Sequence, residues 1–244
     1  MNLLATSIAL AAVGSFGGLV LASSILLVRD RTRERVVSIL ISYAVGTLLA
    51  VSLLRLLPEA LDQLPARRVL SSLLAGIFAF FVLEKLVIWR HCHEGGECDV
   101  HGQTASLVMM GDAVHTFVDG AIIGAAVLTS LPLGISTAVA AAAHEIPQEI
   151  GDFAVLLHAG YTRRRALLLN VVAGTTGILG AVAVYFAAGV APWALPYTVA
   201  FAAGSFLYVA MSDLIPSLHR GQADPNAWRQ VVLIVAGVAT ILAL

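Results

Sequence analysis

The stretch "AVAAAAHEIPQEIGDF", residues 138–153, puts four ionisable side chains into an apolar segment: His144, Glu145, Glu149 and Asp152. The chain as a whole is 59% hydrophobic and only 12% charged. An ionisable side chain in hydrocarbon costs about 2.5 kcal/mol or more, so it persists where it pairs, binds an ion or lines a wet cavity. The stretch therefore predicts a buried polar site, whose character depends on the residues around it.

The composition predicts an all-α integral membrane protein. Its mean hydropathy is +0.91, and apolar runs recur from one end of the 244 residues to the other. A helix needs about 20 apolar residues to cross the hydrocarbon layer. We therefore predict eight transmembrane helices in a single domain, 1–244, at 3–28, 36–57, 69–89, 104–130, 132–159, 164–188, 195–217 and 228–244.

The basic residues predict the orientation of these spans. Of the fourteen lysines and arginines, eleven lie in or beside the loops after the first, third, fifth and seventh spans: Arg29, Arg31, Arg33, Arg35, Lys85, Arg90, Arg163, Arg164, Arg165, Arg220 and Arg229. Arg67 and Arg68 lie on the opposite side, and Arg55 lies within the second span. By the positive-inside rule, the four loops are cytoplasmic and both termini lie outside. The net charge of −1 does not itself bear on nucleic acid, but no basic surface suggests it, so we expect no nucleic-acid partner.

The predicted cytoplasmic loop at 90–103 is rich in possible metal ligands. It begins "RHCHEGGECDVHG" and contains His91, His93, His101, Cys92 and Cys98. The H-x-H and C-x5-C spacings match no structural zinc site, and the reducing cytoplasm disfavours a disulfide. Two interpretations stay open, namely a loose loop that collects metal and a polar linker that happens to contain histidine.

Polar stripes run along two neighbouring spans, those at 104–130 and 132–159. Residues four apart in a helix lie on the same face. The pairs with this spacing are His115 with Asp119, His144 with Gln148, and Glu145 with Glu149. If the two spans pack together, imidazole, carboxylate and amide groups can therefore converge at one depth.

Such a set of ligands suits a divalent transition metal, because imidazole binds zinc, iron, nickel or copper and carboxylates extend the range towards manganese. No lysine or arginine lies on either span to neutralise the acids. The candidate ligands are His115, Asp119, His144 and Glu145. For Asp112, Glu149 and Asp152 two interpretations stay open: accessory residues of a metal pathway, or structural acids, of which the last two would pair with Arg163–Arg165.

Five segments carry longer motifs. On the two polar spans these are "HTFVDG" at 115–120 and "HEIPQEIGDFAVLLHAG" at 144–160. The others are "LLAVSLLRLLPEAL" at 48–61, "AGIFAFFVLEKL" at 75–86 and "FAAGSFLYVAMSDLIPSL" at 201–218. Together they resemble the ZIP family of divalent metal transporters, especially the branch whose fifth helix reads HEIPHE. The resemblance covers nearly the whole chain and includes the eight-span topology with both termini outside.

This resemblance implies a transporter and not an enzyme. It implies that zinc, or else iron, manganese or cadmium, moves into the cytoplasm between the fourth and fifth spans. It further implies a homodimer, surrounded by lipid, in which the first, fourth, fifth and sixth spans move against the others. We expect a multi-pass protein of the cytoplasmic (inner) cell membrane of a bacterium.

By position, the resemblance implies a primary metal site formed by His115, Asp119, His144 and Gln148. A second site would use Thr116, Glu145 and shared carboxylates. Three departures from the family pattern affect these expectations. Thr116 replaces an asparagine and Gln148 a histidine or glutamate, which should weaken the second site. Arg55 replaces a histidine near the expected entrance, where its charge would repel metal unless Glu59 or Asp62 neutralises it.

The alternatives are a metal-dependent intramembrane hydrolase and a non-transporting membrane metal sensor in which the 90–103 loop reports to a partner. "HEIPQ" resembles the start of the zinc-protease signature H-E-x-x-H. However, the second histidine is replaced by Gln148, and Pro147 interrupts the turn, so the two-imidazole zinc site of those enzymes is absent. The hydrolase is therefore the weaker alternative.

The orientation can be tested by thiol labelling in a chain whose Cys92 and Cys98 are replaced by serine. A cysteine at Ser130 or Ala194 should react with a membrane-impermeant reagent added to intact cells, because the positive-inside rule places both positions outside. A cysteine at Thr162 should react only after the membrane is permeabilised. The reverse pattern would contradict the predicted orientation.

Overall fold

The structure, a computed structural model, describes residues 2–25, 30–89, 100–219 and 227–244. These residues form helices and short connections, and no strand occurs among them. The prediction of an all-α fold is therefore confirmed. The residues 90–99 of the histidine loop, with His91 and His93, lie outside the described part. The helix that follows begins at Val100, so His101 lies in its first turn.

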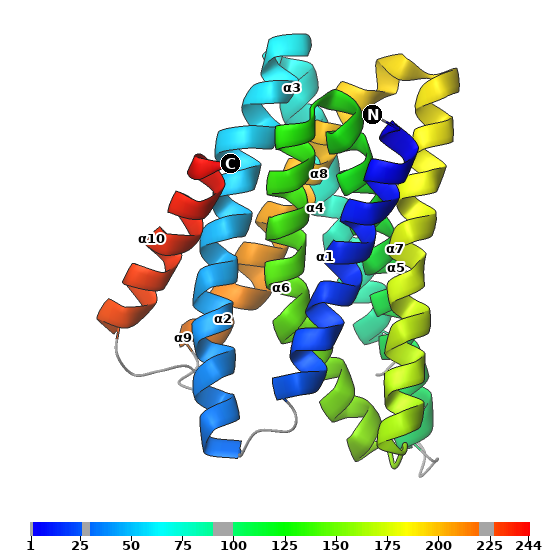
Figure 1. Ribbon diagram of the computed structural model, residues 1–244, viewed down its shortest axis with the longest axis vertical. Helices are drawn as coiled ribbons and strands as arrows, with labels where there is room; N and C mark the ends of the chain where they lie inside the picture. Colours follow the sequence, from blue (N-terminus) through cyan, green and yellow to red (C-terminus); the bar gives the residue numbers. More distant parts are fainter. Residues whose placement is uncertain (1, 26–29, 90–99, 220–226) are drawn as a thin grey trace.

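Each of the eight predicted spans coincides with one long helical segment (Figure 1). These are α1 (Leu3–Ile25), α2 (Asp30–Val51) continued by η1 (Ser52–Leu56) and α3 (Leu57–Gln63), α4 (Ala66–Trp89), α5 (Val100–Thr129), α6 (Leu131–His158), α7 (Arg163–Val190), α8 (Leu195–Val209) continued by η3 (Ala210–Leu214) and α9 (Ile215–His219), and α10 (Ala227–Ala243). A short 3-10 turn, η2 (Pro192–Ala194), precedes α8. The segments η1 and η3 are π-helical, and each ends two residues before a proline, Pro58 or Pro216.

Six helical stretches in the described residues are long and apolar enough to cross a membrane: Leu3–Ser24, Arg35–Gln63, Ala66–Lys85, Val108–Thr129, Arg163–Val190 and Pro192–Leu218. The helix α10 is shorter, and α6, which carries the polar stripe, is not among the six. That α6 and α10 also cross the membrane, which would make eight spans, therefore remains a prediction.

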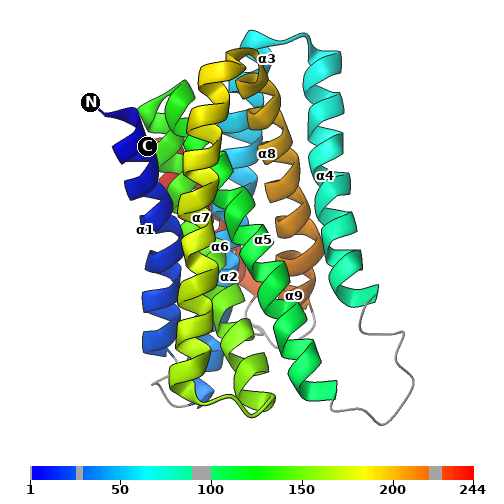
Figure 2. The ribbon, with the colours of Figure 1, turned by 90° about the vertical axis from the view of Figure 1, so that its right-hand side faces the viewer.

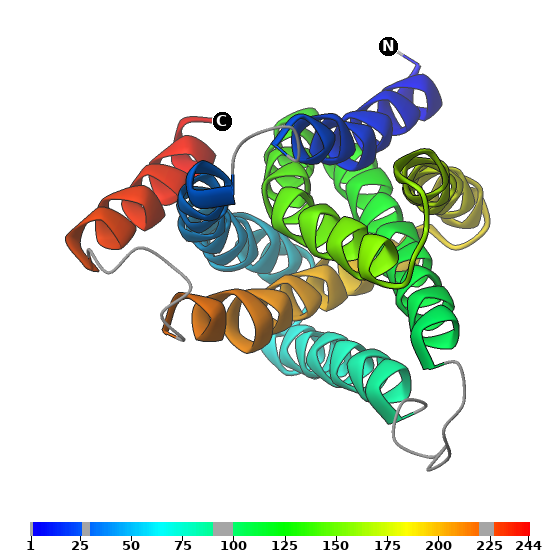
Figure 3. The ribbon, with the colours of Figure 1, turned by 90° about the horizontal axis from the view of Figure 1, so that it is seen from below.

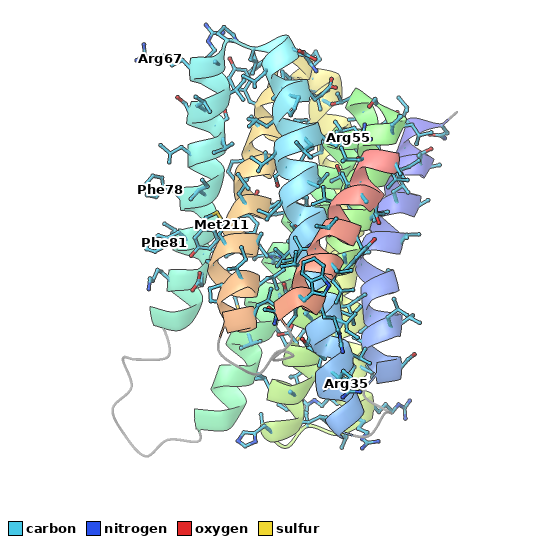
Figure 4. The ribbon with its side chains drawn as sticks, turned by 90° about the vertical axis from the view of Figure 1, so that its left-hand side faces the viewer. Arg35, Arg55, Arg67, Phe78, Phe81 and Met211 are labelled. Atoms are coloured by element: carbon cyan, nitrogen blue, oxygen red, sulfur yellow. The ribbon has the colours of Figure 1, made fainter. Side chains whose placement is uncertain are left out.

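The outer surface of the bundle is apolar, as a lipid environment requires. Phe78, Phe81 and Met211 are exposed on the side formed by α4 and η3 (Figure 4). Trp193 and Trp228 are also exposed, and both lie at the beginning of a helical segment. Exposed tryptophans at helix ends are typical of the boundary between lipid and water.

Arginines lie at both ends of the bundle. Arg67 lies at the end where α3 meets α4, and Arg35 lies at the opposite end (Figure 4). Both chain termini lie in the half that contains α3 (Figure 1). The cluster Arg163–Arg165 begins α7 at the same end as Arg35. The orientation of the bundle in the membrane stays a prediction.

The polar helix α6 is enclosed by protein. It packs against α1, α2, α5 and α7, whereas α4 and α10 lie at the periphery (Figure 3). Ionisable residues in membrane spans are found facing the interior of a bundle, where protein groups or water can solvate them. The fold thus provides α6 with the surroundings that its sequence requires.

Glycines bring α5 into direct contact with α7. A Cβ atom added to Gly120 would lie 1.8 Å from the carbonyl oxygen of Gly177. One added to Gly180 would lie 2.0 Å from the carbonyl oxygen of Phe117. Small residues let membrane helices approach closely and gain van der Waals contact. These close contacts hold α5 against α7 and so fix the position of the metal-ligand candidates on α5.

A pair of substitutions can test this contact. We expect Gly120→Ala to lower the free energy of unfolding by about 3 kcal/mol or more, since the methyl group meets backbone atoms that cannot move independently. Gly189→Ala, at the exposed end of α7, has no atom within 4 Å of the added Cβ and serves as the control. Its stability should change by less than about 1 kcal/mol. Thermal unfolding in detergent measures both, and equal melting temperatures for the two variants would contradict the packing.

Candidate metal site between α5 and α6

Four predicted ligands meet in the interior of the bundle. His115 and Asp119 come from α5, while His144 and Glu145 come from α6, and all four are buried. One possible ligand atom from each lies within 4.8 Å of the corresponding atoms of the others. The structure thus brings together the four residues that the charge argument selected.

The distances within this cluster resemble those between ligands of one ion. His115 Nε2 lies 3.1 Å from His144 Nε2, and Asp119 Oδ2 lies 3.0 Å from His144 Nε2 and 3.8 Å from His115 Nε2. Ligands roughly 2.0 to 2.2 Å from a tetrahedral zinc ion lie about 3.3 to 3.6 Å from one another. The three observed distances scatter around that range.

The orientation of His144 favours ligation. Its Nδ1 lies 3.1 Å from the carbonyl oxygen of Ala140, which can only accept a hydrogen bond. A proton on Nδ1 leaves the Nε2 lone pair free, and such a carbonyl contact commonly orients a histidine that binds metal. The Nε2 lone pair then faces the carboxylate of Asp119, neither oxygen of which makes a hydrogen bond. Two electron-pair donors in such proximity need a cation or a proton between them.

Two phenyl rings from outside α5 and α6 hold the imidazoles in place. Phe80 of α4 contacts the His115 ring edge-to-face, with 5.4 Å between ring centroids. Phe206 of α8 contacts His144 in the same way at 5.7 Å. Both phenylalanines are buried. Sequence analysis missed their role, although both lie in the quoted segments 75–86 and 201–218.

Thr116 and Gln148 are directed at a third residue, Asp112. Gln148 Nε2 donates to Asp112 Oδ1 at 3.0 Å, and Thr116 Oγ1 donates to the same oxygen at 3.5 Å. Asp112 is buried, and its Oδ2 has no hydrogen-bond partner. In this arrangement the two residues that the family resemblance implicates solvate a carboxylate next to the four-residue cluster.

In the described part of the chain, the remaining carboxylates of α6 have no arginine partner. Glu145, Glu149 and Asp152 are buried, and each has at least one oxygen without a hydrogen bond. Among the described residues, no ion pair links Glu149 or Asp152 to Arg163–Arg165. The described residues thus give no support to pairing of these two acids with that cluster, and their role as accessory residues of a metal pathway stays a prediction.

A cavity of about 390 Å³ extends from the cluster towards the end of the bundle that carries Arg35. One wall, from α5 and α6, includes His115, His144, Asp112, Gln148, Pro147 and Asp152. The facing wall, from α4, α8 and η3, includes Glu84, Tyr208 and Asp213. Tyr208 donates a hydrogen bond to Glu84. The cavity is large enough to hold water, and four acids line it: Asp112, Asp152, Glu84 and Asp213.

Sequence analysis did not identify Glu84 and Asp213. The signal was present, because both are ionisable residues inside predicted spans, at 69–89 and 195–217. By the same argument that selected the stripe of α6, they require an ion, a partner or water.

Towards the other end of the bundle, apolar side chains cover the cluster. Ile122 and Ile123 lie one turn beyond Asp119 on α5, and Phe206 packs against His144. All three are almost completely buried. The site is thus reached from the end that carries Arg35 and is closed by packed side chains on the opposite side.

Arg55 does not face Glu59 or Asp62 as a neutralising partner. Its Nη2 donates to the carbonyl oxygen of Ile241 at 3.0 Å, and its Nε donates to the same oxygen at 3.3 Å. These contacts satisfy a carbonyl group at the C-terminal end of α10 (Figure 4), a common position for a basic side chain. Glu59 instead accepts from Gln63. The charge of Arg55 is therefore directed at α10.

Comparison with known proteins gives a consistent result. A family model described as "ZIP Zinc transporter" matches residues 90–244. Zinc transporter ZIP4 of Homo sapiens is 42% identical over 132 residues, which are 54% of this chain and 20% of that protein. Zinc transporter ZIP13 of Pongo abelii is 32% identical over 222 residues, which are 83% of this chain and 65% of that protein.

The chain thus spans about one fifth of the length of ZIP4 and just under two thirds of ZIP13. The matched region of the family model includes α5 and α6 with all four residues of the cluster. The motifs, the helical fold and these matches agree, and the chain belongs to the ZIP zinc transporter family.

Proposed function

We propose that this protein transports divalent transition metal ions, zinc foremost, across a membrane into the cytoplasm through the cluster of His115, Asp119, His144 and Glu145. The observation that carries the proposal is the convergence of these four buried groups between two helices of a membrane bundle. The relatives matched above are named zinc transporters, which supports the choice of metal. No enzymatic step is needed to account for the residues.

The donor set also bears on selectivity. Two imidazoles and two carboxylates bind zinc in tetrahedral geometry, and the carboxylates make iron, manganese and cadmium acceptable as well. Gln148 and Thr116 both donate hydrogen bonds to Asp112, which lies next to the cluster. We therefore assign these two residues a supporting role in the same site. Because neither can contribute a carboxylate, we propose one tightly bound ion.

The cavity and the charges support the proposed direction. The cavity connects the cluster with the end of the bundle that the positive-inside rule makes cytoplasmic. Asp112, Asp152, Glu84 and Asp213 would attract a cation that leaves the cluster and let it recover its water there. The opposite side is closed, so this is the inward-facing state of an alternating-access cycle. Uptake requires a second state in which Ile122, Ile123 and Phe206 no longer cover the cluster.

The other proposals rest on the family resemblance. They are a homodimer, a position in the cytoplasmic membrane of a bacterium, and metal collection by the segment 90–103, which contains His91, His93 and His101. A membrane hydrolase is disfavoured because Gln148 stands where the H-E-x-x-H signature of zinc proteases has its second histidine. A sensor would bind metal without moving it, which a flux measurement distinguishes.

Zinc uptake into sealed vesicles that contain the purified chain tests the proposal. We expect His144→Ala to reduce the rate by more than about tenfold, because even the outer partners of metal ligands contribute roughly 10- to 100-fold. His158→Ala serves as the control, since it removes an exposed histidine from the end of the same helix. Iron, manganese and cadmium added in turn should compete with zinc.

Circular dichroism and gel filtration should show that both variants fold. If His144→Ala transports zinc at the parental rate, the cluster is structural and the proposal fails. If the parental chain binds zinc but moves none, the sensor is the better interpretation.

A further inference from the structure

A second hollow lies on the outside of the bundle, between α5 and α7. It has a volume of about 280 Å³, and its floor is formed by the buried side chains of Met109, Leu156 and Ala173. Met110 and Val172, both 63% exposed, border it on the lipid side. Almost all of its surface is apolar. An apolar chain of matching width therefore fits it.

The groove has a structural cause. The helices α5 and α7 touch at Gly120 and Gly177, where a Cβ atom would not fit. From there α5 slants away from α7 towards the end that carries Arg163–Arg165 (Figure 2). Thr176 Oγ1 donates to the carbonyl oxygen of Ala113 at 2.7 Å and marks where the divergence begins. The groove is thus part of the way the two helices cross.

The mouth of the groove is positively charged. Arg165 lines it, and its guanidinium carbon lies 4.8 Å from the centroid of the Tyr161 ring, which also lines it. This stacking leaves the guanidinium edge free to bind an anion. Arg163 and Arg164 precede it at the N-terminus of α7, where unpaired N–H groups also favour negative charge. The positively charged Arg165 therefore lies beside the apolar groove, at the N-terminal end of α7.

We propose that this groove binds an anionic phospholipid, with one acyl chain between α5 and α7 and the phosphate held by Arg165. Basic pockets between membrane helices are typical sites for acidic headgroups. The inference does not depend on the transport activity. A lipid at this site would contact α5 and α7 where they diverge, within three residues of Asp112 through Met109 and Ala113.

Native mass spectrometry of the full chain in detergent can test the site. The probes are phosphatidylglycerol and phosphatidylcholine with identical acyl chains, added in equal amounts. We expect the parental chain to retain phosphatidylglycerol preferentially. Arg165→Gln should reduce that preference about fivefold, the usual contribution of one basic residue near an anionic lipid. Arg164→Gln removes the same charge from a residue that does not line the groove, so it should change the preference less than Arg165→Gln does.

A second variant tests the acyl-chain part. Val172→Trp should fill the groove from its exposed edge and lower the retention of both lipids, without disturbing the buried floor. Three outcomes would overturn the proposal: equal retention of the two lipids by the parental chain, equal losses in Arg164→Gln and Arg165→Gln, or unchanged retention in Val172→Trp. The second of these would indicate diffuse attraction to the arginine cluster only.

Discussion

The lone pairs of His144 Nε2 and Asp119 Oδ2, 3.0 Å apart in the interior of a membrane bundle, can coexist only with positive charge between them. No lysine or arginine lies on α5 or α6, so that charge is either a proton on the imidazole or a cation bound between the two helices. A permanently bound cation would neutralise the carboxylate for good. A cation that exchanges would make the cluster one binding site along a transport pathway. The adjacent acid-lined cavity favours the mobile ion, since it provides water and further carboxylates on one side of the cluster.

The rest of the fold serves this constraint in two ways. Close glycine contacts hold α5 against α7, so its ligands cannot drift from those of α6. The enclosure of α6 keeps its carboxylates away from lipid, where they would be most costly. Phe80 and Phe206 complete the surroundings by holding the imidazole rings from the facing helices. The proposed binding and release of an ion require such rigidity around the ligands together with a cavity on one side of them.

Local patterns in the sequence predicted the helices and the ligand cluster. A spacing of four residues fixes which side chains share a helix face, so His115 with Asp119 could be grouped without a structure. The pairing of α5 with α6 also followed, because short connections make consecutive helices neighbours. What depended on distant parts of the chain could not be predicted. Arg55 binds a carbonyl group 186 residues away, and Glu84 meets Tyr208 across 124 residues.

X-ray absorption at the zinc edge, on the full chain loaded with one equivalent of zinc, tests the central claim most directly. The cluster predicts a four-coordinate ion with only nitrogen and oxygen neighbours at roughly 2.0 to 2.2 Å, two of them imidazoles. In His144→Ala one imidazole contribution should disappear. Sulfur neighbours at about 2.3 Å would place the ion on Cys92 and Cys98 of the loop instead. That result, or a shell of water oxygens alone, would contradict the account.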